Sequence, residues 1–226
     1  MQDRLKGWTI VFDLDGTLVE TAPDLLGALN HTLGRAGLAP VELSVIHIMI
    51  GDGAKAMIAM GFGFHGQSVD DIAMEDHWNV FIAHYRDNVV VDSFLYDGVV
   101  EAMEALDAEG ATLAVCTNKQ QVLAERVLTE IGIADRFAAI VGADSVPNRK
   151  PDPGHIVEAV IRSGGDPSRA VMIGDSRTDE KAARNAGLPF LFVPFGYEAA
   201  PADEIDAVAI VHHYSELLRS VMAATA

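Results

Sequence analysis

Cysteine is nearly absent from this chain: Cys116 is the single cysteine among 226 residues, so no disulfide can form within the sequence. That scarcity suits a reducing cytoplasm, where we expect the protein to work. Positive charge is also scarce, because 16 lysines and arginines face 33 aspartates and glutamates, which gives a formal net charge of −17. A surface with this charge repels polyanions, which disfavours nucleic acids and anionic membranes as partners.

Long apolar runs are missing as well. No run approaches the roughly 20 apolar residues that a membrane-spanning helix needs. Residues 1–6 lead into a short strand-like stretch without the apolar segment of a signal peptide. Half of the residues are nevertheless hydrophobic, which is ample material for a buried core. We therefore expect a soluble, acidic, cytoplasmic protein, and its length favours one domain with an insertion.

Short, uniformly apolar runs recur along the chain, and most are followed by a helical pattern. Runs without alternation predict strands that are buried on both faces, as in a parallel sheet. A helical stripe such as Leu123, Val127 and Ile131 closes at Gly132. This alternation predicts an α/β fold with a doubly wound parallel sheet. The expected strands span residues 8–12, 112–116, 138–141, 170–173, 189–194 and 207–212.

Residues 21–92 break this rhythm, because they hold helical patterns and no clear strand. We predict a second, smaller, all-helical domain there. It interrupts an α/β domain made of residues 1–20 and 93–226. Thr21 and Asp24 have the spacing of a capping box, which predicts the start of the first inserted helix.

The first of four polar motifs runs from Phe12 to Thr17 and places Asp13 and Asp15 just after a predicted strand. Ligands bind at the carboxyl ends of the strands in open parallel sheets. Residues two apart in extended backbone face the same side, so both carboxylates can point into one crevice. One can attack while the other transfers a proton. The alternative is a turn in which aspartates only make local hydrogen bonds.

Two further motifs offer groups that bind anions. Thr117-Asn118-Lys119 follows another predicted strand, and its hydroxyl, amide and backbone N–H groups can surround an anion or simply begin a helix. Lys150 precedes Pro151 and supplies a point charge that suits a phosphate, unless it is an ordinary solvated loop lysine.

The fourth motif, residues 174–179, lies at the end of a third predicted strand and opens a helix. Asp175 and Asp179 are hard oxygen ligands of the kind that Mg²⁺ prefers. Ser176 and Asp179 also have capping-box spacing, so Asp179 has the alternative task of securing the start of the helix.

In their order and residue types, the four motifs resemble those of the haloacid dehalogenase superfamily of phosphohydrolases. The resemblance covers residues 8–12 and about 97–193. The position of the insertion is similar to that in the subclass with a helical cap between the first two motifs. Within it, residues 11–21 and 115–119 look most like bacterial phosphoglycolate phosphatases. The resemblance implies a Mg²⁺-dependent phosphomonoesterase that acts on a small phosphorylated metabolite, with 2-phosphoglycolate as the leading substrate.

The resemblance also implies catalytic roles for the motif residues. Asp13 would be the nucleophile and would form an aspartyl-phosphate. Asp15 would protonate the leaving alkoxide and later deprotonate the attacking water. Thr117 would bind a phosphoryl oxygen, and Lys150 would screen the charge between the nucleophile and the phosphoryl group.

Metal and substrate contacts follow from the same resemblance. Mg²⁺ would be held by the Asp13 carboxylate, the Asp15 carbonyl and Asp175, with Asp179 as a ligand or an orienting group. The substrate would also contact residues of two motifs and of the cap. These expected substrate-binding residues are Leu14, Thr17, Asn118, Gly53 and Lys55.

The cap of this subclass closes over the site and contacts the leaving group. Residues 51–55 fall where the family usually carries its substrate-specificity loop. Lys55 would meet a second anionic group, such as the carboxylate of glycolate, or would lie on a solvated helix face. Both interpretations stay open.

Other activities remain as alternatives. The same core serves sugar-phosphate mutases and phosphatases of sugar phosphates, pyrophosphate or nucleotides, and a Schiff base on Lys55 would allow phosphonoacetaldehyde hydrolysis. Halide displacement is disfavoured, because Asp15 supplies an acid and base that only phosphoryl transfer needs. The intact set of Asp13, Asp15, Lys150 and Asp175 disfavours a non-catalytic binding module. A monomer and a homodimer both stay open.

Overall fold

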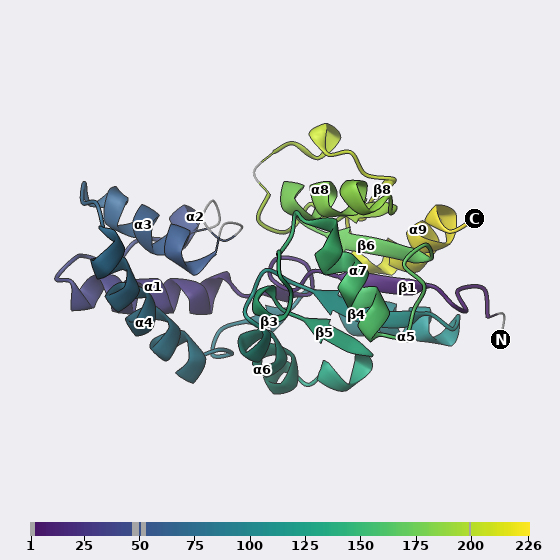
Figure 1. The fold of residues 1–226 in the computed structure, drawn as a ribbon, viewed down its shortest axis with the longest axis horizontal. Coiled ribbons are helices and arrows are strands. Elements are labelled where there is room, and N and C mark those ends of the chain that lie inside the picture. The colour runs from purple at the N-terminus through teal and green to yellow at the C-terminus, as the bar shows by residue number, and fades with distance from the viewer. Residues whose placement is uncertain (1–2, 47–49, 51–52, 199) are drawn as a thin grey trace. The chain divides into compact units, whose positions relative to one another are not determined.

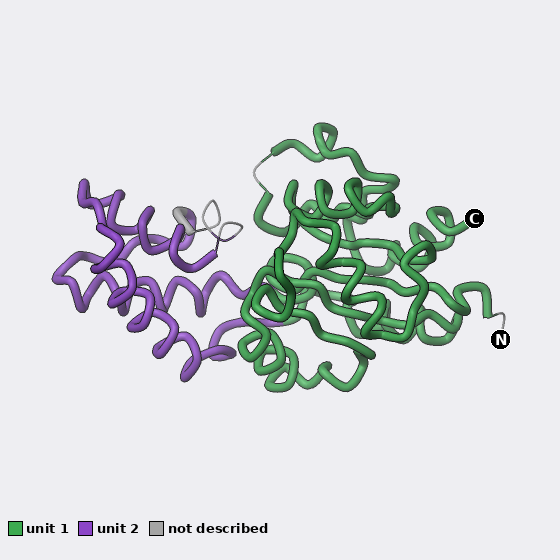
Figure 2. Tube along the Cα trace, viewed as in Figure 1, with its two compact units in different colours: residues 1–19, 95–226 green, residues 20–94 purple. Residues whose placement is uncertain are grey.

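The computed structural model describes residues 3–46, 50, 53–198 and 200–226. The chain divides into two compact units, one made of residues 1–19 and 95–226 and the other of residues 20–94 (Figure 2). The larger unit contains the sheet, and the smaller unit is built from helices (Figure 1).

The larger unit has a six-stranded parallel sheet with strand order β5-β4-β1-β6-β7-β8. This is the α/β fold with a parallel sheet that the apolar runs predict. The strands are β1 (Thr9–Phe12), β4 (Thr112–Cys116), β5 (Ala139–Val141), β6 (Ala170–Gly174), β7 (Phe190–Phe192) and β8 (Ala209–Ile210).

The central strands carry no alternation because both of their faces are buried. Val11 of β1 and Met172 of β6 lie in one apolar cluster with residues of α7 (Pro153–Arg162) and α8 (Arg177–Ala186). The intervening residues Ile10, Phe12 and Ile173 are also fully buried. Burial on both faces favours apolar side chains along these strands, and Thr9 at the start of β1 is a buried polar exception.

Among the remaining helices of the larger unit, α6 (Gln121–Ile131) ends where the sequence predicts. The stripe with Leu123 and Val127 is buried, and Gly132 terminates its helix in the left-handed conformation with φ +88°. These helices are α5 (Val99–Ala108), α6 (Gln121–Ile131) and α9 (Leu217–Ala224).

Strand register brings three polar loops to one edge of the sheet. Phe12, the last residue of β1, pairs with Val115 of β4 and with Ile173 of β6. The segments that follow these strands therefore begin side by side at the carboxyl edge, which is where ligands bind in such sheets.

The smaller unit holds four helices among its described residues. Leu29, Leu33, Ile58, Phe81 and Tyr85 form its buried interior. The helices are α1 (Ala22–Arg35), α2 (Leu43–Ile46), α3 (Ala54–Phe64) and α4 (Asp71–Asp87). The short strands β2 (Val19–Glu20) and β3 (Phe94–Leu95) pair with each other, and the chain passes between the units within these two strands. Over the described ranges, each helix is too short or too polar to cross a bilayer.

The capping box predicted at Thr21 and Asp24 is wrong. The Thr21 side chain makes no capping hydrogen bond. The Asp24 carboxylate instead accepts hydrogen bonds from the backbone N–H groups of Val91, Asp92 and Ser93 at 2.9, 3.0 and 2.9 Å. It also accepts one from the Ser93 hydroxyl at 2.6 Å. Asp24 therefore ties the beginning of α1 to the segment that leads into β3.

Candidate active site

Asp13 is the first residue after β1, and its backbone N–H donates to the carbonyl of Ile173 at 2.9 Å. Its carboxylate Oδ1 lies 2.9 Å from Lys150 Nζ and accepts the N–H of Leu14 at 2.7 Å. Leu14 is one of the residues expected to contact substrate, and here its N–H donates to Asp13. Backbone and lysine together orient the Asp13 carboxylate.

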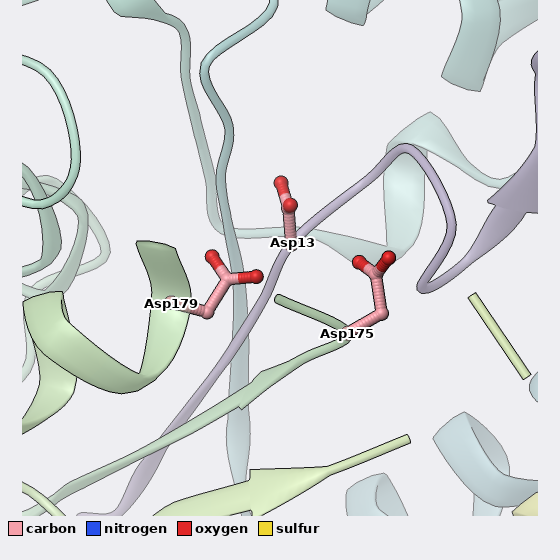
Figure 3. Close-up of side chains that lie close together, drawn as sticks. All are labelled: Asp13, Asp175 and Asp179. Carbon is pink, nitrogen blue, oxygen red and sulfur yellow. The ribbon is translucent and has the colours of Figure 1, made fainter. Parts of the chain in front are cut away.

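Asp13, Asp175 and Asp179 lie close together at the carboxyl edge of the sheet (Figure 3). Each offers one carboxylate oxygen, and these three oxygens lie within 4.8 Å of one another. Asp175 directly follows β6, and Asp179 belongs to the first turn of α8. Carboxylate oxygens at this spacing are a suitable ligand set for a hard divalent cation.

The negative charges of this cluster repel one another. Burial raises the pKa of Asp13 to about 7, and the charges of Asp179 and Asp15 also raise it, whereas Lys150 opposes the rise. Burial, then Asp179 and Asp13, raise the pKa of Asp175 well above its ordinary value. A bound cation would relieve both effects, so the electrostatics of the cluster fit a metal as well as its donor atoms do.

The Asp175 carboxylate is held by two hydrogen bonds. Thr17 Oγ1 donates to its Oδ1 at 2.8 Å, and the backbone N–H of Tyr197 donates to its Oδ2 at 2.8 Å. Gly16 has φ +78°, and a Cβ there would collide with this carboxylate. Thr17, expected to contact substrate, is fully buried, and the structure places its hydroxyl on Asp175 instead.

Lys150 is 2% exposed and lies between two carboxylates. Its Nζ is 2.7 Å from Asp179 Oδ1 and 2.9 Å from Asp13 Oδ1. The other oxygen of Asp179, Oδ2, accepts the N–H and hydroxyl of Ser176, which completes the predicted capping box at α8. The helix-capping interpretation of Asp179 is therefore confirmed, and its other carboxylate oxygen faces Lys150.

Sequence reasoning missed His155, which is fully buried in α7. Its Nδ1 accepts the backbone N–H of Lys150 at 3.1 Å, and its Nε2 lies 3.1 Å from the carbonyl of Val141. These contacts require a neutral ring with its hydrogen on Nε2. Burial and the Lys150 charge lower the pKa of His155 to about 4. His155 thus fixes the backbone of Lys150 to the end of β5.

The loop after β4 contributes two residues of the second motif. Thr117 is 1% exposed, and its N–H donates to the carbonyl of Val141 at 3.0 Å. The Asn118 amide donates to the carbonyl of Lys150 at 3.0 Å. Its amide oxygen is buried and has no hydrogen-bond partner within the described part of the chain. The second and third motifs are therefore in direct contact.

The Asp15 carboxylate lies outside the cluster of three described aspartates and faces Lys119. Lys119 Nζ is 2.8 Å from Asp15 Oδ1, and only 5% of the lysine side chain and 16% of the aspartate side chain are exposed. The Asp15 carboxylate therefore pairs with a lysine and is separate from the three clustered carboxylates. Sequence reasoning assigned Lys119 no role of its own, because the Asp15 carboxylate that it contacts comes from another loop.

Part of the expected substrate loop, residues 51 and 52, lies outside the described residues. Gly53 immediately precedes α3 and has φ +91°. Lys55 forms an ion pair with Glu75, and its Nζ lies 5.6 Å from the centre of the Trp78 ring. Half of its side chain is exposed. Both of these contacts of Lys55 are with residues of α4.

Comparisons with known proteins agree with this geometry. A family model for haloacid dehalogenase-like hydrolases matches residues 10–193. A phosphoglycolate phosphatase of Caulobacter vibrioides is 42% identical over 213 residues, 94% of this chain and 90% of that protein. One from Agrobacterium fabrum is 41% identical over 207 residues, 92% of this chain and 89% of that protein. The crystal structure of a predicted phosphoglycolate phosphatase from Haemophilus somnus is similar with a TM-score of 0.87 and 29% identity, covering 95% of this chain and 97% of that one.

Proposed function

The chain belongs to the haloacid dehalogenase-like hydrolase family, and we propose that it hydrolyses 2-phosphoglycolate to glycolate and inorganic phosphate. The observation that carries the proposal is the meeting of Asp13, Lys150, Asp175 and Asp179 at one edge of the sheet. The similarity to relatives named for this activity supports the choice of substrate.

Asp13 acts as the nucleophile. One of its carboxylate oxygens bonds to phosphorus while the bond from phosphorus to the glycolate oxygen breaks, which leaves an aspartyl-phosphate. Division into two displacements replaces one difficult step with two easier ones. The ammonium of Lys150, 2.9 Å from Asp13 Oδ1, screens the repulsion between the carboxylate and the phosphate dianion.

Asp15 acts as the acid and then as the base. It gives its proton to the departing glycolate oxygen in the first displacement. It takes a proton from the water that attacks phosphorus in the second, which releases phosphate and restores the Asp13 carboxylate. The Thr117 hydroxyl and the Asn118 amide, at the end of β4, bind phosphoryl oxygens.

Mg²⁺ is the proposed cation of the carboxylate cluster, held by Asp13, Asp175 and the Asp15 carbonyl, with Asp179 beside them. When bound, it supplies positive charge that lowers the repulsion between the Asp13 carboxylate and the phosphoryl oxygens. Thr17 keeps Asp175 oriented for this role through its hydrogen bond to Oδ1.

The smaller unit is proposed to act as a helical cap that excludes water during phosphoryl transfer. Its expected bounds are residues 21–92, and Gly53 is its candidate for close approach to the leaving group. A cytoplasmic location and a small phosphorylated metabolite as partner complete the proposal. The single cysteine, buried at the end of β4, is in keeping with a reducing compartment.

The test is a panel of kcat/KM values measured with Mg²⁺ on small phosphates. It includes 2-phosphoglycolate, a hexose phosphate, pyrophosphate and a nucleoside monophosphate. We expect 2-phosphoglycolate to exceed each of the others by at least about tenfold, a difference of about 1.4 kcal/mol in transition-state binding. A hexose phosphate, pyrophosphate or nucleotide that equals it would reject the proposed substrate, and conversion of a sugar phosphate to its isomer would favour a mutase.

A further inference from the structure

Lys119 is a nearly buried cation beside the proposed acid and base. Its side chain is 5% exposed, and its ammonium lies 2.8 Å from Asp15 Oδ1. Lysine side chains are rarely buried without a partner of opposite charge, because desolvation of an ammonium is costly. The Asp15 carboxylate offsets part of that cost in this structure, and a substrate anion beside the same ammonium would offset more.

The other lysine of the site is already committed to two carboxylates. Lys150 Nζ lies within 2.9 Å of both Asp13 and Asp179. Four aspartates and these two lysines surround the site, and a substrate carboxylate would add further negative charge. A dianionic phosphate with an attached carboxylate therefore needs a cation on the side of its leaving group.

The dimensions of the substrate allow its carboxylate to reach Lys119. The glycolate oxygen must come within hydrogen-bond reach of Asp15 to receive its proton, about 2.6–3.2 Å. One methylene carbon joins this oxygen to the carboxyl group, so the carboxylate lies about one hydrogen-bond length from it. An ammonium in contact with Asp15 is therefore within reach of the substrate carboxylate as well, and it carries three N–H donors.

We propose that Lys119 is the specificity-determining residue that binds the carboxylate of the leaving group. The inference rests on the proposed hydrolysis of 2-phosphoglycolate and deepens it, because it assigns recognition of the carboxylate to the sheet-bearing unit. Lys55 of α3 is the rival residue. The structure gives Lys55 a partner in Glu75 and a position over the Trp78 ring, with half of its side chain exposed.

The test compares two substrates with leaving groups of similar size. 2-Phosphoglycolate releases an alkoxide with a carboxylate, and ethyl phosphate releases one with a methyl group in its place. The quantity measured is the preference, which is kcat/KM for 2-phosphoglycolate divided by kcat/KM for ethyl phosphate. It is determined for the wild type and for Lys119→Met, Lys119→Arg, Lys55→Met and Lys181→Met. Lys181 is an exposed lysine of α8 and is the matched control.

We expect Lys119→Met to lower activity on both substrates, because Asp15 loses its partner, and to lower the preference at least tenfold. Lys119→Arg should keep most of the preference, since it keeps the charge. Lys181→Met and Lys55→Met should leave the preference unchanged. Circular dichroism checks folding, and Lys119→Gln replaces the methionine variant if that variant does not fold.

Two results would overturn the inference while the proposed function stands. One is an unchanged preference in the folded Lys119→Met or Lys119→Gln variant, which would limit Lys119 to orienting Asp15. The other is a preference that falls in Lys55→Met and not in the Lys119 variants. A wild type without any preference for 2-phosphoglycolate would instead reject the proposed substrate, and the role of Lys119 with it.

Discussion

Asp13 sits among groups that favour its protonation when no cation is bound. Burial and the neighbouring carboxylates raise its pKa to about 7, above the ordinary value of 3.8. The metal-free protein therefore takes up a proton at Asp13 as the pH falls through about 7. A divalent cation requires the ionised carboxylate and has to displace that proton.

The affinity for Mg²⁺ should consequently fall as the pH is lowered from 8 to 6. Below pH 7 we expect a loss of about tenfold per pH unit for each proton displaced. Isothermal titration calorimetry measures the affinity, and buffers with different ionisation enthalpies reveal the released protons. The fall should be smaller in Asp13→Asn, which has no proton to displace at position 13. An affinity that is flat over this range would contradict the assigned protonation of Asp13.

The role of a single residue was predictable where the residue belongs to a motif. It was less predictable where the residue contacts a distant segment of the chain. Asp13, Asp175 and Asp179 were expected to act together, and the structure brings their carboxylates within 4.8 Å of one another. His155 was not predicted, because its role depends on contacts with Lys150 and Val141 that form only in the folded chain. Thr17 was expected to contact substrate, but its hydroxyl is buried against Asp175.

Elements were predictable where one physical cause dominates. Residues 113–116 are apolar because this part of the strand is buried in the sheet, and the structure gives β4 the predicted bounds, residues 112–116. Gly132 ends α6 because it adopts the left-handed conformation. At the start of α1, two sets of hydrogen-bond donors compete for the Asp24 carboxylate. The spacing of Thr21 and Asp24 fits a capping box, but the backbone of residues 91–93 offers Asp24 more donors.

Asp24 should stabilise the helical unit through that contact. Asp24→Ala leaves three backbone N–H groups and the Ser93 hydroxyl without this acceptor, and unpaired buried donors cost about 1–3 kcal/mol each. Because water reaches part of the site, we expect a total loss of about 2–3 kcal/mol in the free energy of unfolding, measured with a chemical denaturant.

Hydrogen exchange identifies the cause of that loss. The amides of Val91, Asp92 and Ser93 should exchange faster in Asp24→Ala than in the wild type, whereas those of β4 should not change. Asp24→Asn keeps one acceptor oxygen and should show a smaller effect. Unchanged exchange at residues 91–93 would mean that the Asp24 carboxylate does not hold this segment.

At the scale of the whole molecule, the prediction of an α/β hydrolase of the haloacid dehalogenase-like family is confirmed. The prediction was possible because four motifs in a fixed order are characteristic of the family. Each motif follows a strand or precedes a helix that the hydrophobic pattern predicts. The net charge of −17 poses the central difficulty for such an enzyme, since both the nucleophile and the substrate are anions. In the proposed mechanism, Lys150, Lys119 and a cation bound at the aspartate cluster would offset that charge where the phosphate binds.

Asp13, as the residue that takes up the phosphoryl group, is the centre of the proposed mechanism. The direct test is rapid acid quenching of the wild type after mixing with ³²P-labelled 2-phosphoglycolate and Mg²⁺, followed by borohydride reduction and peptide mass spectrometry. An acyl phosphate is reduced to the alcohol, so the account predicts homoserine at position 13 and none in a folded Asp13→Asn variant. Homoserine at Asp15 or at another carboxylate, or turnover without any labelled protein, would contradict it.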